Sequence, residues 1–297
     1  MAELATDGTV DFPESMDFGI TVEFEPNYGE PSRIFRTMTG LIEACEVIDR
    51  DLAASISIRV TPVLLLEKVQ VGSLTAWLKY VLTSVDDDAL KNLDWKKAVG
   101  AYLVRGKKRV VEFLDKRETI ENAREIYQLR GILQETAAEA GLTLISLNTP
   151  IPAPRVAEDL RVLSDATTPL LAEDSAQFVT VEGSVSINTS FRLTSDAIEK
   201  ILTQESTTTE DEMVLMVKKP DFLGDSMWDF RHEGKRIPAK VLDTIWLETF
   251  HRGAVALRSG DALRAWVEIQ TNYASDQEVV GTHYRILRVL QVIPRHD

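Results

Sequence analysis

The stretch from Met213 to Gln270, MVLMVKKPDFLGDSMWDFRHEGKRIPAKVLDTIWLETFHRGAVALRSGDALRAWVEIQ, decides the fold of the C-terminal third of the chain. Apolar runs of strand length alternate in it with turn signals, of which residues 232–235, His-Glu-Gly-Lys, indicate a tight hairpin. A short helix is predicted from Asp243 to Phe250, and a last strand from Tyr284 to Ile293. Five strands and one helix within about 85 residues are typical of a small closed or partly closed barrel.

A change of composition precedes this stretch. Residues 204–212, QESTTTEDE, are polar and hold no apolar anchor, which predicts an exposed linker. The barrel domain is therefore expected at 213–297 and a larger α+β domain at 17–203. The acidic residues 1–16 are expected to form a flexible N-terminus.

The larger domain is predicted to contain a mixed sheet with several long helices. Alternation of apolar and polar residues indicates a first strand at 17–25, and apolar residues at helical spacing follow Pro31. Further strands are expected at 55–60, 63–71, 142–147 and on both sides of the turn 182–184. Helices are expected at 74–85, 95–117, 119–140, 155–166 and 194–202.

Composition indicates a soluble protein of the cytoplasm. The hydrophobic fraction of 44% is ordinary for a globular chain, and charged residues or glycine interrupt the longest apolar runs. No run reaches the roughly 18 residues that a membrane helix needs. The acidic N-terminus lacks the basic and apolar regions of a secretory signal. Cys45 is the only cysteine, as expected in a reducing compartment.

Two stretches carry a resemblance to a known family. The sequence KKPDFLGDSMWDFRHEGKRIPAKVLDTIWLETFHRGAVALRSGDALRAWVEI, residues 218–269, resembles a C-terminal five-stranded β-barrel module of uncharacterised two-domain bacterial proteins. The stretch SISIRVTPVLLLEKVQVGSLTAWL, residues 55–78, looks like the α+β domain that accompanies this module. The resemblance implies the two-domain fold and an association with bacterial phage-defence or mobile-element systems, but no activity.

A basic segment stands out in a chain whose formal net charge is −14. Residues 96–117 hold eight basic and two acidic residues, and apolar residues recur there at helical spacing. We expect an amphipathic helix with a cationic face that docks an acidic surface of another protein through Arg105, Lys108, Arg109 and Lys116. The alternative is that these cations compensate the chain's own carboxylates. Nucleic acid remains a candidate ligand that the net charge disfavours.

Arg264 and Trp266 form a second candidate binding site. They lie on the polar phase of the strand predicted at 263–270, where an exposed tryptophan would suit an interface. The alternative is that Trp266 packs beneath the helix that begins near Asp243.

Standard catalytic signatures are absent from the sequence. It contains no GxxxxGK[ST], GxGxxG, GxSxG or HExxH motif. Pro220-Asp221 with Glu233-Gly234-Lys235 matches the letters of a metal-dependent nuclease site, but Gly234 favours a turn at that place. Asp86-Asp87-Asp88 could bind Mg²⁺, although capping of a helix accounts for the same residues. We therefore predict no catalytic residue, no metal and no cofactor.

The preferred hypothesis is a non-enzymatic binding or regulatory component of a bacterial multiprotein system. A nucleic-acid-associated factor is the first alternative, because small barrels often bind single strands, and affinity that falls with salt would favour it. A metal-dependent enzyme that uses Asp and Glu is the second, and stabilisation by metal would favour that one.

Overall fold

The structure is a computed structural model that describes residues 12–13, 15–26, 28–56, 60–70, 74–84, 95–142, 150–222 and 226–295. The chain divides into two compact units, the N-terminal unit Met1–Ile201 and the C-terminal unit Leu202–Asp297. The predicted α+β class is confirmed, with a sheet and long helices in the first unit and a closed five-stranded barrel in the second.

An antiparallel sheet forms the centre of the N-terminal unit, with the strand order β2-β3-β1-β4-β5. The central strand β1 is buried on both faces. Phe18, Ile20 and Val22 point to one face, whereas Gly19 lies against the ring of Trp77 on the other. A Cβ atom on Gly19 would stand 2.7 Å from that ring, so only glycine fits there. The strands are β1 (Phe18–Glu23), β2 (Val60–Gln70), β3 (Leu74–Ser84), β4 (Ser175–Thr180) and β5 (Gly183–Ile187).

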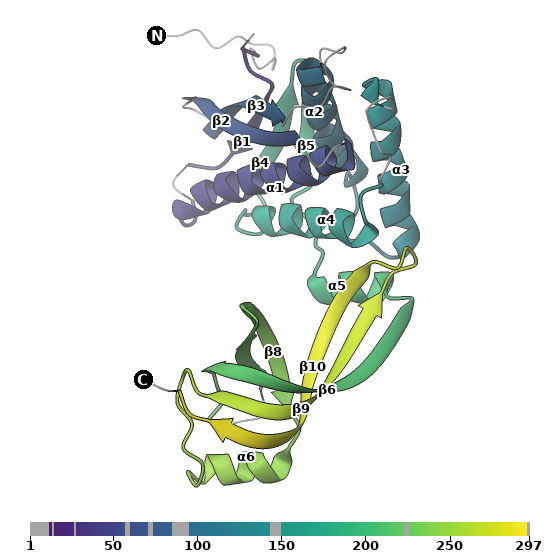
Figure 1. Cartoon of the computed structure of the whole chain (residues 1–297). Coiled ribbons are helices and arrows are strands. Elements are labelled where there is room, and N and C mark those ends of the chain that lie inside the picture. Colours follow the sequence, from purple (N-terminus) through teal and green to yellow (C-terminus); the bar gives the residue numbers. More distant parts are fainter. Residues whose placement is uncertain are drawn as a thin grey trace. The chain divides into compact units, whose positions relative to one another are not determined.

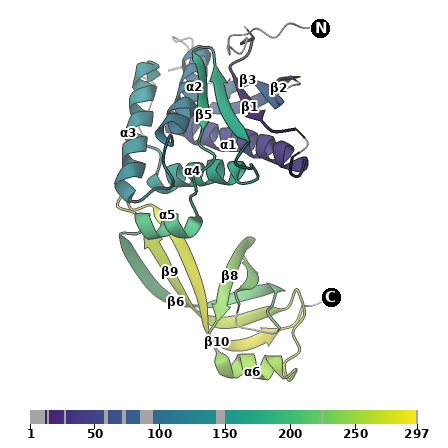
Figure 2. The same cartoon turned by 180° about the vertical axis from the view of Figure 1, so that it is seen from behind.

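Two layers of helices cover one side of this sheet (Figures 1 and 2). The inner helices α1 (Ser32–Ile56) and α2 (Trp95–Phe113) contact the strands, and α3 (Ala123–Glu139) and α4 (Ala153–Thr167) pack outside them. The close approach of α1 and α4 depends on Gly40, where a Cβ atom would lie 3.0 Å from the Cα of Ala166. The short helix α5 (Ser195–Leu202) spans the boundary in the sequence, since the first unit ends at Ile201.

A buried ion pair fixes the start of α1. The Nε and Nη2 atoms of Arg33 donate hydrogen bonds of 2.8 and 3.0 Å to the two carboxylate oxygens of Asp174. Asp174 also accepts the backbone N–H of Leu171, at 3.0 Å. The hydrogen bond from Arg33 lowers the pKa of Asp174. A bidentate pair of this kind fixes orientation as well as distance, so α1 is tied to the loop that leads into β4.

The C-terminal unit is a closed barrel with the strand order β10-β8-β7-β6-β9. Its strands are β6 (Glu205–Lys219), β7 (Trp228–His232), β8 (Lys235–Val241), β9 (Ala262–Tyr273) and β10 (Val279–Ile293). A single helix, α6 (Thr244–His251), separates the third strand from the fourth, and the third and fifth strands pair in parallel. This connectivity of five strands in a Greek-key barrel is that of the OB-fold.

Aromatic side chains fill the barrel beside α6. Trp228 and Phe230 of β7 are buried, and their rings stack with centroids 5.9 Å apart. Trp246 and Phe250 of α6 pack on Trp228, with ring centroids 5.9 and 5.2 Å from that of Trp228. Asp243 caps the helix by accepting the backbone N–H of Trp246 at 3.0 Å.

The predicted linker at 204–212 is wrong for residues 205–212, which form the first half of β6. They pair in register with β9, from Glu205 opposite Tyr273 to Glu212 opposite Trp266. Together with the ends of β9 and β10 they make a three-stranded arm that extends beyond the barrel (Figure 1). Because all of 205–212 are exposed, the arm needs no apolar anchor, and the threonines at 207–209 favour an extended backbone.

The helix predicted at 74–85 is also wrong, because residues 74–84 form strand β3. β3 lies between β1 and β2, and Thr75 to Leu78 are buried whichever face they point to. A strand buried on both faces loses its alternating pattern and cannot be told from a helix by periodicity. Ser55 and Ile56, expected in a strand, are the last residues of α1.

Several predictions fall outside the described residues. They concern most of the flexible N-terminus (1–11 and 14), the triplet Asp86-Asp87-Asp88, and residues 143–147 of the strand expected at 142–147. In the described part of the chain, no helix is both long enough and apolar enough to cross a membrane.

A carboxyl pair joins α1 to α4 and makes the stability of this contact depend on pH. Asp159 of α4 is 4% exposed, and burial raises its pKa well above the usual value. Its hydrogen bond and proximity to Asp51 of α1 raise the pKa further, whereas Arg155 opposes the rise. The folded state therefore holds a proton that the unfolded state releases once the pH exceeds the ordinary pKa of aspartate.

We predict that Asp159→Asn flattens the dependence of stability on pH. The wild-type contribution is fully present below the unfolded-state pKa and is lost as the pH rises through the folded-state pKa, at up to about 1.4 kcal/mol per pH unit. Urea unfolding at increasing pH should show the variant gaining stability relative to wild type. Asp165→Asn, on the exposed side of α4, is the matched control, and equal pH profiles of all three proteins would contradict the prediction.

Candidate functional site

Helix α2 sorts its side chains into a buried face and a cationic face. The predicted apolar face is confirmed, since its members are all buried: Val99, Tyr102, Leu103, Val110, Phe113 and Leu114. Gly106 allows close packing against α1, because a Cβ atom there would lie 2.8 Å from Leu52. The basic residues of the segment do not share one environment, and the structure divides them into three groups.

Lys107 alone forms the first group, because it points into the core. It is 1% exposed, as is Asp49 of α1. The ammonium group donates to the carboxylate of Asp49, to the hydroxyl oxygen of Tyr80 in β3, and to the carbonyl of Leu103 at 3.1 Å. Tyr80 in turn donates to both carboxylate oxygens of Asp49, at 2.8 Å. All three ammonium protons of Lys107 are therefore satisfied, as burial of a charge requires.

The surroundings of this cluster are apolar and aromatic. The ammonium nitrogen of Lys107 lies 4.7 Å from the ring centroid of Phe18 and 4.9 Å from that of Tyr80. Burial raises the pKa of Asp49, and Lys107 opposes the rise. Burial likewise raises the pKa of Cys45 to about 12, so this thiol stays protonated and unreactive. The cluster joins α1, α2 and β3, and its two charged members, Lys107 and Asp49, are almost fully buried, so we assign it a structural role.

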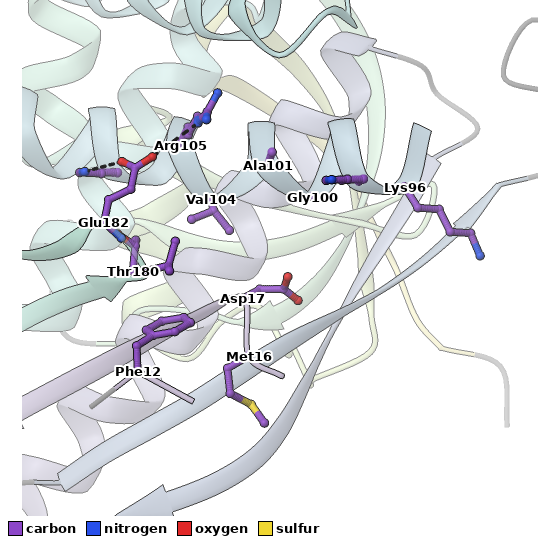
Figure 3. Close-up of a pocket in the computed structure, with 13 residues that line it drawn as sticks. Phe12, Met16, Asp17, Lys96, Gly100, Ala101, Val104, Arg105, Thr180 and Glu182 are labelled. Carbon is purple, nitrogen blue, oxygen red and sulfur yellow. Dashed lines mark hydrogen bonds and ion pairs between the residues drawn. The ribbon is translucent and has the colours of Figure 1, made fainter. Parts of the chain in front are cut away.

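The second group of cations lines a cleft of about 310 Å³ beside α2 (Figure 3). Lys96, Lys97, Arg105 and Lys108 contribute from the helix, and Glu182 and Val181 from the β4–β5 turn. Figure 3 shows Arg105 and Glu182 at one end, Lys96 at the other, and Phe12 with Met16 along the opposite side. Four cations face two carboxylates in this lining, so the cleft is an anion-binding environment.

The spacing of residues on α2 explains the floor of the cleft. Positions 97, 101, 104 and 108 recur every three or four residues, so they share one face of the helix. The residues between the terminal lysines are small, namely Gly100, Ala101 and Val104. A Cβ atom on Gly100 would meet only a methyl group of Leu82 at 3.9 Å, so the floor stays open. Small residues with lysines at both ends of the row create a shallow trough with charged ends.

The chain's own Glu182 occupies one end of this trough. Its carboxylate accepts a hydrogen bond of 2.8 Å from Lys108 and lies 4.0 Å from the Nε of Arg105. The bond from Lys108 lowers the pKa of Glu182. Asp17, the other carboxylate of the lining, accepts the backbone N–H of Tyr80 at 2.7 Å. Glu182 is half exposed, at 51%, so this internal pairing is weak and open to competition.

The third group of cations is paired away from the cleft. Arg109 lies 3.1 Å from Glu112, and Lys116, beyond the end of α2, lies 3.7 Å from Asp115. Arg117 binds Glu125 at 2.6 Å. The predicted set is thus divided: Arg105 and Lys108 meet in the cleft, whereas Arg109 and Lys116 do not. Compensation of the chain's own carboxylates accounts for Arg109 and Lys116.

The second candidate pair, Arg264 and Trp266, lies on β9 in the C-terminal unit. Trp266 is 39% exposed, and its indole nitrogen donates to Glu210 of β6 at 2.8 Å. Arg264 forms an ion pair with Glu212 of β6. Helix α6 packs on a core that includes Trp228 and Phe230 but not Trp266. The alternative, in which Trp266 packs beneath that helix, is therefore wrong. Both side chains brace β9 against the first half of β6.

The residues of the nuclease-like motif lie in turns and loops. Glu233 and Gly234 both have positive φ angles, of 48° and 82°, and form the two-residue turn between β7 and β8. Asp221 accepts the backbone N–H of Ser226 at 2.9 Å in the preceding loop. Among the described residues, no group of three His, Cys, Asp or Glu side chains is arranged to hold a metal ion.

Lys107 and Glu182 were missed by sequence reasoning. Lys107 carries no sequence signal that separates it from Lys108, except that it falls in phase with Leu103 and Val110 on the apolar face. Glu182 could be placed only in a hairpin turn, and its partner across the cleft lies 74 residues away.

Comparison of the chain with protein-family models, with curated proteins and with solved structures found no match. The resemblance of residues 55–78 and 218–269 to a bacterial two-domain family therefore stays a prediction.

Proposed function

We propose that the protein is a non-enzymatic binding component that takes an acidic segment of another protein into the cleft beside α2. The observation that carries the proposal is the gathering of Lys96, Lys97, Arg105 and Lys108 around a trough with a floor of small residues. The described lining holds no His, Cys or Ser side chain and includes cations that donate several hydrogen bonds each. Such a site suits recognition of carboxylates better than catalysis.

The dimensions of the trough fit a short extended peptide. Lys97 and Lys108 are eleven positions apart on α2, which corresponds to about 16 Å at 1.5 Å per residue. An extended chain of about five residues covers that length. Two acidic side chains at the ends of such a segment would meet cations, and small or apolar residues between them would lie over Gly100, Ala101 and Val104. Phe12 and Met16 supply apolar contact along the other side.

The cellular setting of this binding is inferred from the sequence. The resemblance of residues 55–78 and 218–269 supports a role in a bacterial multiprotein system, including phage defence or mobile elements. The single cysteine supports a place in the cytoplasm, where an acidic partner would be met.

Charge reversal in the cleft should abolish binding of an acidic probe. We predict that Lys97→Glu with Arg105→Glu weakens binding of a fluorescein-labelled oligoglutamate peptide at low salt by at least about tenfold. Each exposed ion pair contributes up to about 1 kcal/mol, and reversal replaces attraction by repulsion. Fluorescence anisotropy on the full chain measures the affinity, and thermal unfolding checks the fold.

Arg109→Glu with Lys116→Glu is the matched control, because it changes the charge equally on the same segment but outside the cleft. This control should keep the wild-type affinity within about twofold. Equal losses in both variants would mean that only net charge matters and would overturn the proposal. Loss of oligothymidylate binding instead of oligoglutamate binding in the cleft variant would assign the cleft to nucleic acid and overturn it too.

Removal of the internal carboxylate should strengthen binding. Glu182→Gln frees Lys108 and Arg105 for the ligand, so we predict that the oligoglutamate affinity rises by about twofold to fivefold, the value of one exposed ion pair. Glu112→Gln, which releases Arg109 outside the cleft, is the control and should leave the affinity unchanged. An unchanged affinity in Glu182→Gln would show that the ligand does not compete for this place.

A further inference from the structure

Strand β2 forms one edge of the sheet in the N-terminal unit. Among the described strands it pairs with β3 alone, from Val60 to Gln70. The other side of β2 is therefore a free edge, whose backbone N–H and C=O groups can take up a further strand. Four apolar side chains of β2 are between 41% and 56% exposed, namely Val63, Leu65, Leu66 and Val69. Exposed apolar residues gathered on an unpaired edge mark an interaction surface.

The direction of the backbone groups decides which residues of β2 can bond to a further strand. The carbonyl of Leu78 in β3 accepts the N–H of Asp17 at 3.0 Å, and the N–H of Tyr80 donates to the Asp17 carboxylate at 2.7 Å. The backbone groups of Leu78 and Tyr80 thus point toward β1 and away from β2. Leu66 stands opposite Leu78, and Leu64 opposite Tyr80. Opposite residues of an antiparallel pair point both toward or both away from each other, so Leu64 and Leu66 present their backbone groups to the free edge.

A hollow of about 530 Å³ lies between β2 and α1. It is lined by residues of both elements, namely Glu46, Asp49, Arg50 and Ala54 of α1 and residues 60–64 of β2. Glu46 and Arg50 carry opposite charges, and the carboxylate of Asp49 is bound by Lys107. The hollow therefore presents no net charge, and its β2 side is mostly apolar.

The second half of β2 carries side chains that fit such a hollow. Leu64 shares the face of its opposite residue Tyr80, which contacts α1 through Asp49. Leu66 and Val69 lie on the same face, because a β-bulge just after Leu66 inserts one extra residue before Val69. One half of β2 thus borders a hollow beside α1, and the other half presents exposed apolar side chains on the same face.

We propose that the protein forms a two-fold symmetric dimer in which the β2 edges of two copies pair antiparallel, with Leu65 at the axis. In this register Leu64 of each copy stands opposite Leu66 of the other. The two pairs can exchange about four backbone hydrogen bonds, because both residues point to the free edge. Leu66 and Val69 of each copy then enter the hollow of the other copy beside Leu64 and Pro62. The two Leu65 side chains meet on the face of the sheet opposite the helices.

The self-complementarity of this edge identifies the occupant as a second copy. The hollow and the protruding side chains lie on opposite sides of Leu65 along one strand, as a two-fold axis at Leu65 requires. The charged residues of β2 are one acid and one base, Glu67 and Lys68, so pairing gathers no excess of like charge although the chain carries −14. Pro62 has no N–H to donate, which confines the pairing to the middle of the strand. The surface lies within the N-terminal unit and does not involve the cleft beside α2.

The test measures the mass of the full chain by sedimentation over a range of concentrations. An interface of this small size should give a dissociation constant on the order of 10 µM for the wild-type dimer. Leu65→Lys and Leu65→Glu should each weaken association by at least about tenfold, because like charges then stand opposite each other at the axis. An equimolar mixture of the two variants should form a dimer again, since each lysine then faces a glutamate.

Ile245→Lys is the matched control, because it places the same charge at an exposed apolar residue of α6 in the other unit. It should dimerise as wild type does, and thermal unfolding of all samples establishes that they are folded. A monomeric wild type would leave the edge to a different partner and overturn the proposal. Wild-type association of either Leu65 variant, a mixture that stays monomeric, or an equal loss in Ile245→Lys would overturn it too.

Discussion

The buried contact among Lys107, Asp49 and Tyr80 is the constraint on which the N-terminal unit depends. An ammonium group without water must find partners for its charge and its three protons, and here one carboxylate, one hydroxyl and one carbonyl provide them. These partners belong to α1, β3 and α2 itself, so the contact fixes the rotation of α2 about its axis. Lys107 and Lys108 are consecutive, and about 100° of helix turn sends the first into the core and the second into the cleft. The cationic trough therefore follows from the way the opposite side of the same helix is anchored.

Positive charge gathers in the cleft beside α2, although the chain as a whole is acidic. The formal net charge of −14 disfavours any polyanion at long range, yet the cleft beside α2 is locally basic. Two carboxylates, Asp17 and Glu182, face the four cations of this cleft, and Glu182 is bound by Lys108. Elsewhere the cations form intramolecular ion pairs, such as Arg109 with Glu112 and Arg264 with Glu212. Exposed pairs of this kind contribute little to stability, so they leave the fold to the apolar cores and the buried polar contacts.

Sequence patterns predicted the elements that have one buried and one exposed face. They gave the strands of the barrel from Met213 onward, the helix capped by Asp243 and the apolar side of α2, because each of these alternates with the period of its structure. The patterns failed where both faces of an element have the same exposure to solvent, because apolar and polar residues then do not alternate. Thr75 to Leu78 of β3 are covered on both faces and therefore lack the alternation of a half-buried strand, and the first half of β6 is exposed on both faces and resembles a linker. The site was predictable in part: Arg105 and Lys108 could be named, but pairing with Glu182 and the burial of Lys107 depend on contacts between distant segments.

The most direct test of this account is a double-mutant cycle on Asp49 and Lys107, measured by urea unfolding of the full chain. Asp49→Asn and Lys107→Met should each destabilise the fold by about 3–5 kcal/mol, because each leaves the other partner buried and unpaired. The double variant should cost little more than either single variant, which corresponds to a coupling energy of at least about 2 kcal/mol. Additive losses within about 0.5 kcal/mol would contradict the central claim that this pair anchors α2.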